Sequence, residues 1–65
     1  MKVKEAIRLI EKHGWRLARQ KGSHRQFTHP TRPGCVTIAG KLSADLAEGT
    51  VGSILRQAGL RNWKP

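Results

Sequence analysis

The sequence predicts an α+β fold in which three central strands are flanked by a helix at each end, in the order α-β-β-β-α. Apolar residues recur at helical spacing near both ends of the chain, and the part between them consists of short, alternating or β-branched stretches separated by turn residues. Two amphipathic helices on one face of a three-stranded antiparallel sheet would bury both apolar stripes together. The other face of the sheet is expected to stay open.

The first helix is expected over residues 2–13. Its apolar stripe follows the spacing i, i+3, i+4 and i+7 and consists of Val3, Ala6, Ile7 and Ile10. Gly14 can supply the left-handed residue that ends such a helix. The start lacks a good capping side chain, so the first turn is expected to fray.

The next two segments have the pattern of a β-hairpin. Trp15 and Leu17 alternate with less apolar neighbours, and both are expected to pack in the core. A turn over residues 21–23 leads into a second strand over about residues 24–29. Phe27 is expected on the buried face of this second strand.

A third strand is expected over residues 35–39, which are rich in β-branched side chains. Cys35 is expected to serve as a small apolar residue of this strand. The loop that follows, residues 40–48, offers Leu42 and Leu46 as anchors on the core.

The second helix is expected to begin near Thr50, whose hydroxyl can cap the first free amides. Its apolar stripe consists of Val51, Ile54, Leu55 and Ala58. Gly59 would close the helix, and Leu60 is placed for the hydrophobic contact that accompanies such an end.

Length and charge bound the function. Sixty-five residues allow one domain, residues 1–65, and leave too little protein to enclose a deep pocket, which suits a polymer substrate better than a small metabolite. Lysine and arginine number 13 against 4 acidic residues, so the net charge is +9 and the partner is expected to be anionic. No apolar run approaches the roughly 20 residues that cross a bilayer, which argues against a membrane partner.

The sequence suggests neither a metal site nor another cofactor. One cysteine, scattered histidines and four acids form neither a zinc cluster nor a paired-carboxylate magnesium site. The single cysteine has no partner for an internal disulfide, which fits a reducing cytoplasm.

The most informative stretch is Gly22-Ser23-His24. It lies within residues 12–44, a run with seven lysine and arginine residues and no acidic residue. Positive neighbours disfavour the protonated form of a histidine and attract polyanions. His24 is therefore expected to be a proton acceptor held against a phosphate backbone, which indicates RNA chemistry.

The chain also resembles the HicA-type toxins, the small ribonucleases of bacterial toxin–antitoxin pairs. The similarity extends from the opening helix to Leu60 and rests on short motifs in a fixed order. These are Gly14-Trp15, Gly22-Ser23-His24 with Phe27 and Pro30, Gly49-Thr50, and Ile54-Leu55-Arg56-Gln57-Ala58-Gly59-Leu60. Each fragment alone is weak, but the ordered set in a basic chain of this length is fairly specific.

The resemblance implies a fold like that of a double-stranded-RNA-binding domain and endonucleolytic cleavage of mRNA. It also implies that His24 is the catalytic residue and that an acidic HicB-type antitoxin covers the site. Many relatives carry a Pro-His step after the third strand. The corresponding stretch here is Ile38-Ala39-Gly40-Lys41, so a second histidine has no counterpart and Lys41 offers a cation instead.

RNA can be cut without a metal when its 2′-hydroxyl attacks the adjacent phosphorus. A base must take the hydroxyl proton, and cations must stabilise the charge on the phosphoryl oxygens. We assign the base to His24 and the phosphate contacts to Lys21, Arg25 and Lys41. Ser23 can donate to phosphate, and Gly22 lets the backbone approach the RNA, although both residues also suit an ordinary turn.

The other candidate residues also have ordinary structural explanations. His29 precedes a proline and is expected on the strand face opposite to His24, and His13 ends the first helix, where positive charge is favourable. Trp63 either stacks on a base or packs on the protein. A column of cations on the first helix is either a solvated face or a contact to an RNA duplex; it consists of Lys4, Arg8 and Lys12.

Three other functions share these features. A non-catalytic RNA-binding module of the same fold would leave His24 without a chemical role, and intact bound RNA would identify it. A DNA-binding module is disfavoured by the three central strands and the lack of a clear helix-turn-helix. A basic interaction protein would bind only the antitoxin and leave RNA unchanged.

Overall fold

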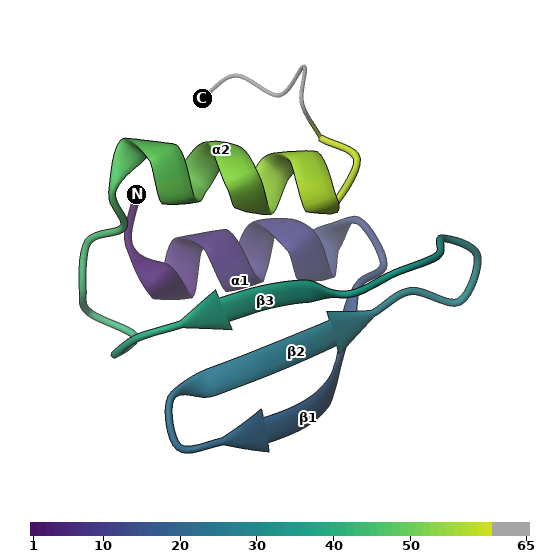
Figure 1. The fold of residues 1–65 in the computed structure, drawn as a ribbon, viewed down its shortest axis with the longest axis horizontal. Coiled ribbons are helices and arrows are strands. Elements are labelled where there is room, and N and C mark those ends of the chain that lie inside the picture. Colours follow the sequence, from purple (N-terminus) through teal and green to yellow (C-terminus); the bar gives the residue numbers. More distant parts are fainter. Residues whose placement is uncertain (61–65) are drawn as a thin grey trace.

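The computed structural model describes residues 1–60 and contains five elements in the predicted order (Figure 1). The elements are α1 (Val3–Lys12), β1 (Arg16–Lys21), β2 (His24–Thr28), β3 (Val36–Ala39) and α2 (Glu48–Gln57). The α+β class and the α-β-β-β-α order are therefore confirmed.

The three strands form an antiparallel sheet in the order β1-β2-β3. Both helices pack against β3, and β1 is the edge of the sheet that lies farthest from them (Figure 1). Phe27, Val36 and Ile38 are at most 1% exposed and form the sheet side of the core. Side chains alternate along a strand. The residues next to these three on β2 and β3 therefore point to the face that α1 and α2 leave open.

The two helices end in the same way. After α1 the N–H of Gly14 donates to the Glu11 carbonyl (3.1 Å) and the N–H of Trp15 to the Ile10 carbonyl (3.1 Å). Gly14 has a φ of +97°, so this is a Schellman motif with glycine in the left-handed position. The corresponding bonds after α2 run from Gly59 to Arg56 and from Leu60 to Leu55, as the sequence predicts.

The start of α1 is capped by a distant loop. As expected, no side chain caps its first amides. Two carbonyls of the loop between β3 and α2 accept these N–H groups instead: Val3 donates to Ala44 (2.9 Å) and Lys4 donates to Leu42 (3.1 Å). The amides that a frayed first turn would leave free are therefore hydrogen-bonded.

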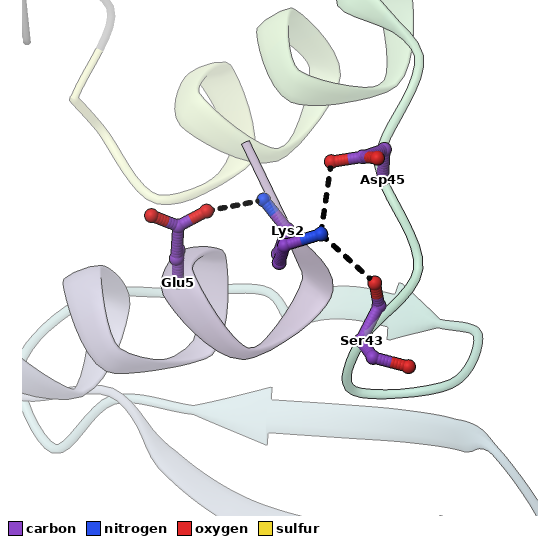
Figure 2. A network of polar contacts seen from close by, with 4 residues as sticks. All are labelled: Lys2, Glu5, Ser43 and Asp45. Atoms are coloured by element: carbon purple, nitrogen blue, oxygen red, sulfur yellow. Dashed lines mark hydrogen bonds and ion pairs between the residues drawn. The ribbon is translucent and has the colours of Figure 1, made fainter.

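Lys2 adds further contacts between the start of α1 and this loop. Its N–H donates to Glu5 Oε1 (2.6 Å), and its ammonium donates to the Ser43 carbonyl (3.3 Å) and lies 3.6 Å from Asp45 Oδ1 (Figure 2). The ion pair is exposed and contributes little energy. Its effect is to collect two of the four acidic residues at the N-terminal end of α1.

The prediction that Leu17 packs in the core is wrong. The side chain is 48% exposed, and every residue of β1 is exposed. Leu17 pairs with the buried Phe27 and so points to the helix side of the sheet. The helices pack against β3 rather than β1, so about half of the Leu17 side chain stays exposed. Trp15, immediately before β1, is buried as predicted, with 1% exposed.

Three details of the second half also differ from the prediction. Cys35 precedes β3 and is exposed. Of the two predicted anchors, Leu46 packs against the core but Leu42 is 51% exposed, because only its backbone carbonyl is used, at the start of α1. Helix α2 begins two residues before Thr50, with Ala47 as its N-cap and no side-chain cap.

The earlier start of α2 has a tertiary cause. The N–H of Leu46 donates to the carbonyl of Met1 (2.8 Å), and Ala47 follows in an extended conformation (φ −64°, ψ 150°). The N-terminal residue of the chain thus holds the segment that leads into the helix. Glu48 then occupies the first turn, where a negative charge is favourable.

Candidate nucleic-acid interface

The Gly22-Ser23 turn is the local structure that presents His24. It is a two-residue turn between Lys21 and His24, which pair directly across the hairpin. Gly22 has a φ of +59° and Ser23 has a negative φ, the combination of a type II′ turn, which favours glycine at its first central position. A Cβ on Gly22 would meet no atom within 4 Å, so the requirement for glycine is conformational.

His24 begins β2 on the open face of the sheet. Its residue is exposed, and its cross-strand neighbours are Lys21 on β1 and Ala39 on β3. Directly opposite residues share a face and have Cβ atoms about 4.5–5.5 Å apart. The imidazole therefore has a lysine on one side and only a methyl group on the other, which leaves it accessible to a large substrate.

Arg25 lies on the other face. It pairs with the buried Ile38, and its Nη1 donates to the carbonyls of Ser23 (3.1 Å) and Gly40 (3.0 Å). The N–H of Gly40 also donates to the Ser23 carbonyl (3.2 Å). Arg25 thus ties the hairpin turn to the end of β3 and fixes the backbone that carries His24. Both bonds use Nη1, so Nη2 remains a donor that the described residues do not engage.

Replacing Arg25 with Ala is expected to lower the melting temperature by roughly 4–8 °C, the shift that about 1 kcal/mol produces in a domain of this size. The change removes two hydrogen bonds from a charged donor, and the Ser23 carbonyl keeps only one partner. Thermal unfolding followed by circular dichroism measures the effect. Arg19→Ala is the matched control, because it removes the same side chain from the same hairpin. Equal shifts in the two variants would show that the two hydrogen bonds of Arg25 do not stabilise the fold.

The predicted site residues come together at one end of the sheet. Lys41 follows Gly40, whose backbone is bonded to Ser23, so the turn and the end of β3 lie side by side. Lys21, Gly22, Ser23, His24, Arg25 and Lys41 all belong to this end. The acidic residues lie elsewhere: they are Glu5 and Glu11 on α1, Asp45 in the loop and Glu48 on α2. No strand carries a carboxylate, so the sheet is the positive side of the molecule.

A comparison with protein families gives a match that spans the described fold. The family described as HicA toxin of bacterial toxin-antitoxin matches residues 3–60, which include every helix and strand of the structure. The chain belongs to the HicA toxin family. A search of curated proteins finds no match.

Membership assigns this HicA protein the role of the toxin in a toxin–antitoxin pair. The shared motifs then acquire structural meanings. Gly14-Trp15 forms the Schellman end of α1, Gly22-Ser23-His24 forms the hairpin turn, and the run that ends in Gly59-Leu60 forms the C-terminal part of α2 with its cap. The first and last of these motifs therefore end the two helices, and the middle one places His24 at the start of β2 on the open face of the sheet.

The other two histidines of this HicA protein lie away from His24, near the end of α1. His13 Nδ1 lies 3.0 Å from the carbonyl of Leu9. His29 Nε2 lies 3.0 Å from the carbonyl of His13, its Nδ1 accepts the N–H of Thr31 (3.1 Å), and its ring meets Trp15 edge-on at 5.2 Å. With Nδ1 accepting, Nε2 carries the proton and donates to His13.

Sequence reasoning missed this role of His29, for which it predicted only a place on the strand face opposite to His24. The ring joins the end of α1 to the loop after β2, across 16 residues. A Cβ on Gly14 would lie 2.6 Å from His29 Nε2, so the glycine is needed for space as well as for its φ. No local pattern signals such a contact, because it depends on how the helix is placed over the sheet.

Four remaining expectations concern other binding partners. Trp63 lies outside the described residues. Within residues 1–60, no helix is both long and apolar enough to cross a membrane, and no three His, Cys, Asp or Glu side chains gather at a point where a metal ion could be held. Lys4, Arg8 and Lys12 are exposed on α1 rather than on the sheet. The N–H of Lys4 donates to the Leu42 carbonyl, so Lys4 lies at the same end of the molecule as the hairpin turn, and Arg8 and Lys12 lie farther along the helix.

Proposed function

We propose that this HicA toxin is an endoribonuclease that cleaves mRNA at the hairpin end of its sheet, with His24 as the general base and no metal ion. The RNA 2′-hydroxyl gives its proton to the imidazole and attacks the adjacent phosphorus. The bond to the 5′-oxygen breaks, leaving a 2′,3′-cyclic phosphate on one fragment. The leaving oxygen takes up a proton, and Lys21 and Lys41 are the candidate donors at this end of the sheet.

One observation carries the proposal: the only histidine on the open face among residues 1–60 lies beside a lysine, on a sheet without carboxylates. A proton acceptor of this kind suits catalysis near neutral pH. The surrounding cations attract a phosphate backbone and stabilise the charge that develops on the phosphoryl oxygens. The accessible position of His24 suits a polymer that lies across the surface.

The RNA contacts in this proposal belong to five residues around His24. Lys21 and Lys41 supply ammonium groups. Arg25 lies on the other face of the sheet and contributes at the hairpin end through Nη2, which forms no bond to the turn carbonyls. The Ser23 hydroxyl donates to a phosphate oxygen. Gly22 has no side chain, so the backbone of the RNA can approach the turn closely.

The partner in this proposal is an acidic HicB-type antitoxin acting in the cytoplasm. A protein that places carboxylates over Lys21 and His24 would exclude RNA from the same surface by charge and by bulk. Antitoxin and RNA would then compete for one face of the toxin's sheet, and release of the antitoxin would restore cleavage.

The purified protein incubated with RNA in EDTA is expected to produce fragments that end in 2′,3′-cyclic phosphate. The products are identified by mass spectrometry, since a metal-dependent hydrolysis would leave a linear phosphate and would stop in the chelator. Absence of cleavage with intact, bound RNA would instead favour the second candidate, a non-catalytic RNA-binding module of this fold. The positive sheet favours that candidate equally, so the analysis of products separates the two.

A further inference from the structure

The register of the β1–β2 hairpin changes once, and the change decides which cations share a face with His24. Arg16 pairs with Thr28 and Leu17 with Phe27, but the next pair is Arg19 with Gln26. Ala18 is the additional residue on β1, so this is a β-bulge. Bulges reorient side chains and occur often at sheet edges and beside active sites.

An unbroken register would place different residues next to His24. If the pairing of Leu17 with Phe27 continued without the extra residue, Gln20 would oppose His24 and Arg19 would oppose Arg25 on the helix side. The bulge instead places Lys21 opposite His24 and Arg19 opposite Gln26. Arg19 is then diagonal to His24 on the open face, where such neighbours are about 7–8 Å apart.

Arg19 and Lys21 differ from the other cations of the hairpin. Arg16 donates from Nη1 to the carbonyls of Glu11 and Trp15, and Arg25 donates to Ser23 and Gly40. Among residues 1–60 the side chains of Arg19 and Lys21 form no hydrogen bond or ion pair, and both residues are exposed. Two free cations on alternate residues of one strand therefore flank the imidazole on its β1 side.

We infer that Arg19 is a phosphate-binding residue of this HicA toxin and that it forms, with Lys21, a subsite for the phosphates next to the one cleaved at His24. The inference rests on the proposed ribonuclease function and adds a residue that sequence reasoning did not select. It also sets the path of the substrate. The RNA strand runs from His24 on β2 to Lys21 and Arg19 on β1, which is an edge strand of the sheet. The bound groups are phosphates, so the subsite contributes affinity without base preference.

Binding of a fluorescent single-stranded RNA oligonucleotide tests the inference without cleavage when every protein carries His24→Ala. The logarithm of the affinity falls linearly with the logarithm of the salt concentration, with a slope of about −0.7 per phosphate contact for single strands. Arg19→Ala is expected to make this slope shallower by about 0.7 and to weaken binding about two- to fivefold, the range for exposed ion pairs. Arg19→Lys, which keeps the charge, is expected to restore the slope.

Arg8→Ala is the matched control, because it removes the same charge from the exposed side of α1. An unchanged slope for Arg8→Ala with a shallower slope for Arg19→Ala supports the subsite. The opposite result would overturn it and place the RNA on the helix. Equal effects of both changes would also overturn it, since they would reflect net charge alone.

Two further results separate this inference from the function on which it rests. If the wild-type protein cleaves RNA and Arg19→Ala binds with an unchanged slope, the subsite is wrong and the ribonuclease stands. If the wild type leaves RNA intact while Arg19→Ala makes the slope shallower, the subsite stands and the proposed ribonuclease function is wrong. Polyglutamate serves as a polyanion of another class; if it binds as tightly as RNA with the same dependence on Arg19, the surface recognises acidic polypeptides and the inference is overturned.

Discussion

Replacing His24 with Ala is expected to reduce RNA cleavage by at least about 100-fold, since a positioned general base contributes about 10²–10⁴-fold to a rate. The imidazole lies on the open face, opposite Lys21 and Ala39, and its loss removes the only histidine of that face among residues 1–60. Initial rates of fragment formation from a defined RNA, compared at equal protein concentration, measure the effect.

The same variant is expected to fold as the wild type does, because His24 is exposed and its side chain forms no hydrogen bond with the described residues. An unchanged melting temperature therefore assigns the loss to chemistry. His13→Ala is the matched control: it removes an exposed histidine at the end of α1 and is expected to leave the rate unchanged. A His24→Ala protein that cleaves at the wild-type rate would refute the assignment of the base.

Replacing Trp15 with Ala is expected to unfold much of the protein at room temperature. Trp15 is 1% exposed and is one of the largest side chains in the core, and Trp→Ala changes in cores cost about 3–5 kcal/mol. Folded domains have about 0.05–0.15 kcal/mol of stability per residue, so a chain of 65 residues has roughly 3–10 kcal/mol in total. Thermal unfolding should show a fall in melting temperature of more than about 12 °C.

Two other variants define the cause of this loss. Trp15→Phe is expected to lose less than half as much stability, because it keeps an aromatic ring against His29 and because the buried Nε1 has no hydrogen-bond partner among the described residues. Leu17→Ala is expected to change the free energy of unfolding by no more than about 0.5 kcal/mol, as for other surface positions. A large loss for Leu17→Ala would mean that β1 is covered, contrary to the structure.

The elements with strong local signals could be predicted well. The helical stripes placed α1 and α2, glycine placed the ends of both helices, and the Gly22-Ser23 turn fixed the hairpin at His24. Each of these depends on neighbours within a few residues, so the pattern along the chain contains the necessary information. Phe27 was predicted correctly as buried for the same reason, because alternation along β2 decides its face.

The errors occur where burial or hydrogen bonding depends on another element. The alternation of Leu17 is correct, but its burial requires a helix over β1, and both helices pack against β3. The start of α2 depends on the carbonyl of Met1, and the capping of α1 depends on carbonyls from the loop after β3. A periodic pattern identifies the face of an element and does not identify what covers that face.

The sequence by itself determined the α+β order, the turn that exposes His24 and the acid-free basic region around it, because these follow from local conformational preference and from composition. The tertiary structure alone decided that Arg19 shares the open face with His24 and that Arg25 lies on the other face. Alternation along β1 cannot reveal the bulge at Ala18, which brings Arg19 and Lys21 to the open face, nor the bonds that hold Arg25 on the other face. Strand register is settled between strands, by pairing and by the placement of the core side chains, and one additional residue reverses the face of every side chain beyond it.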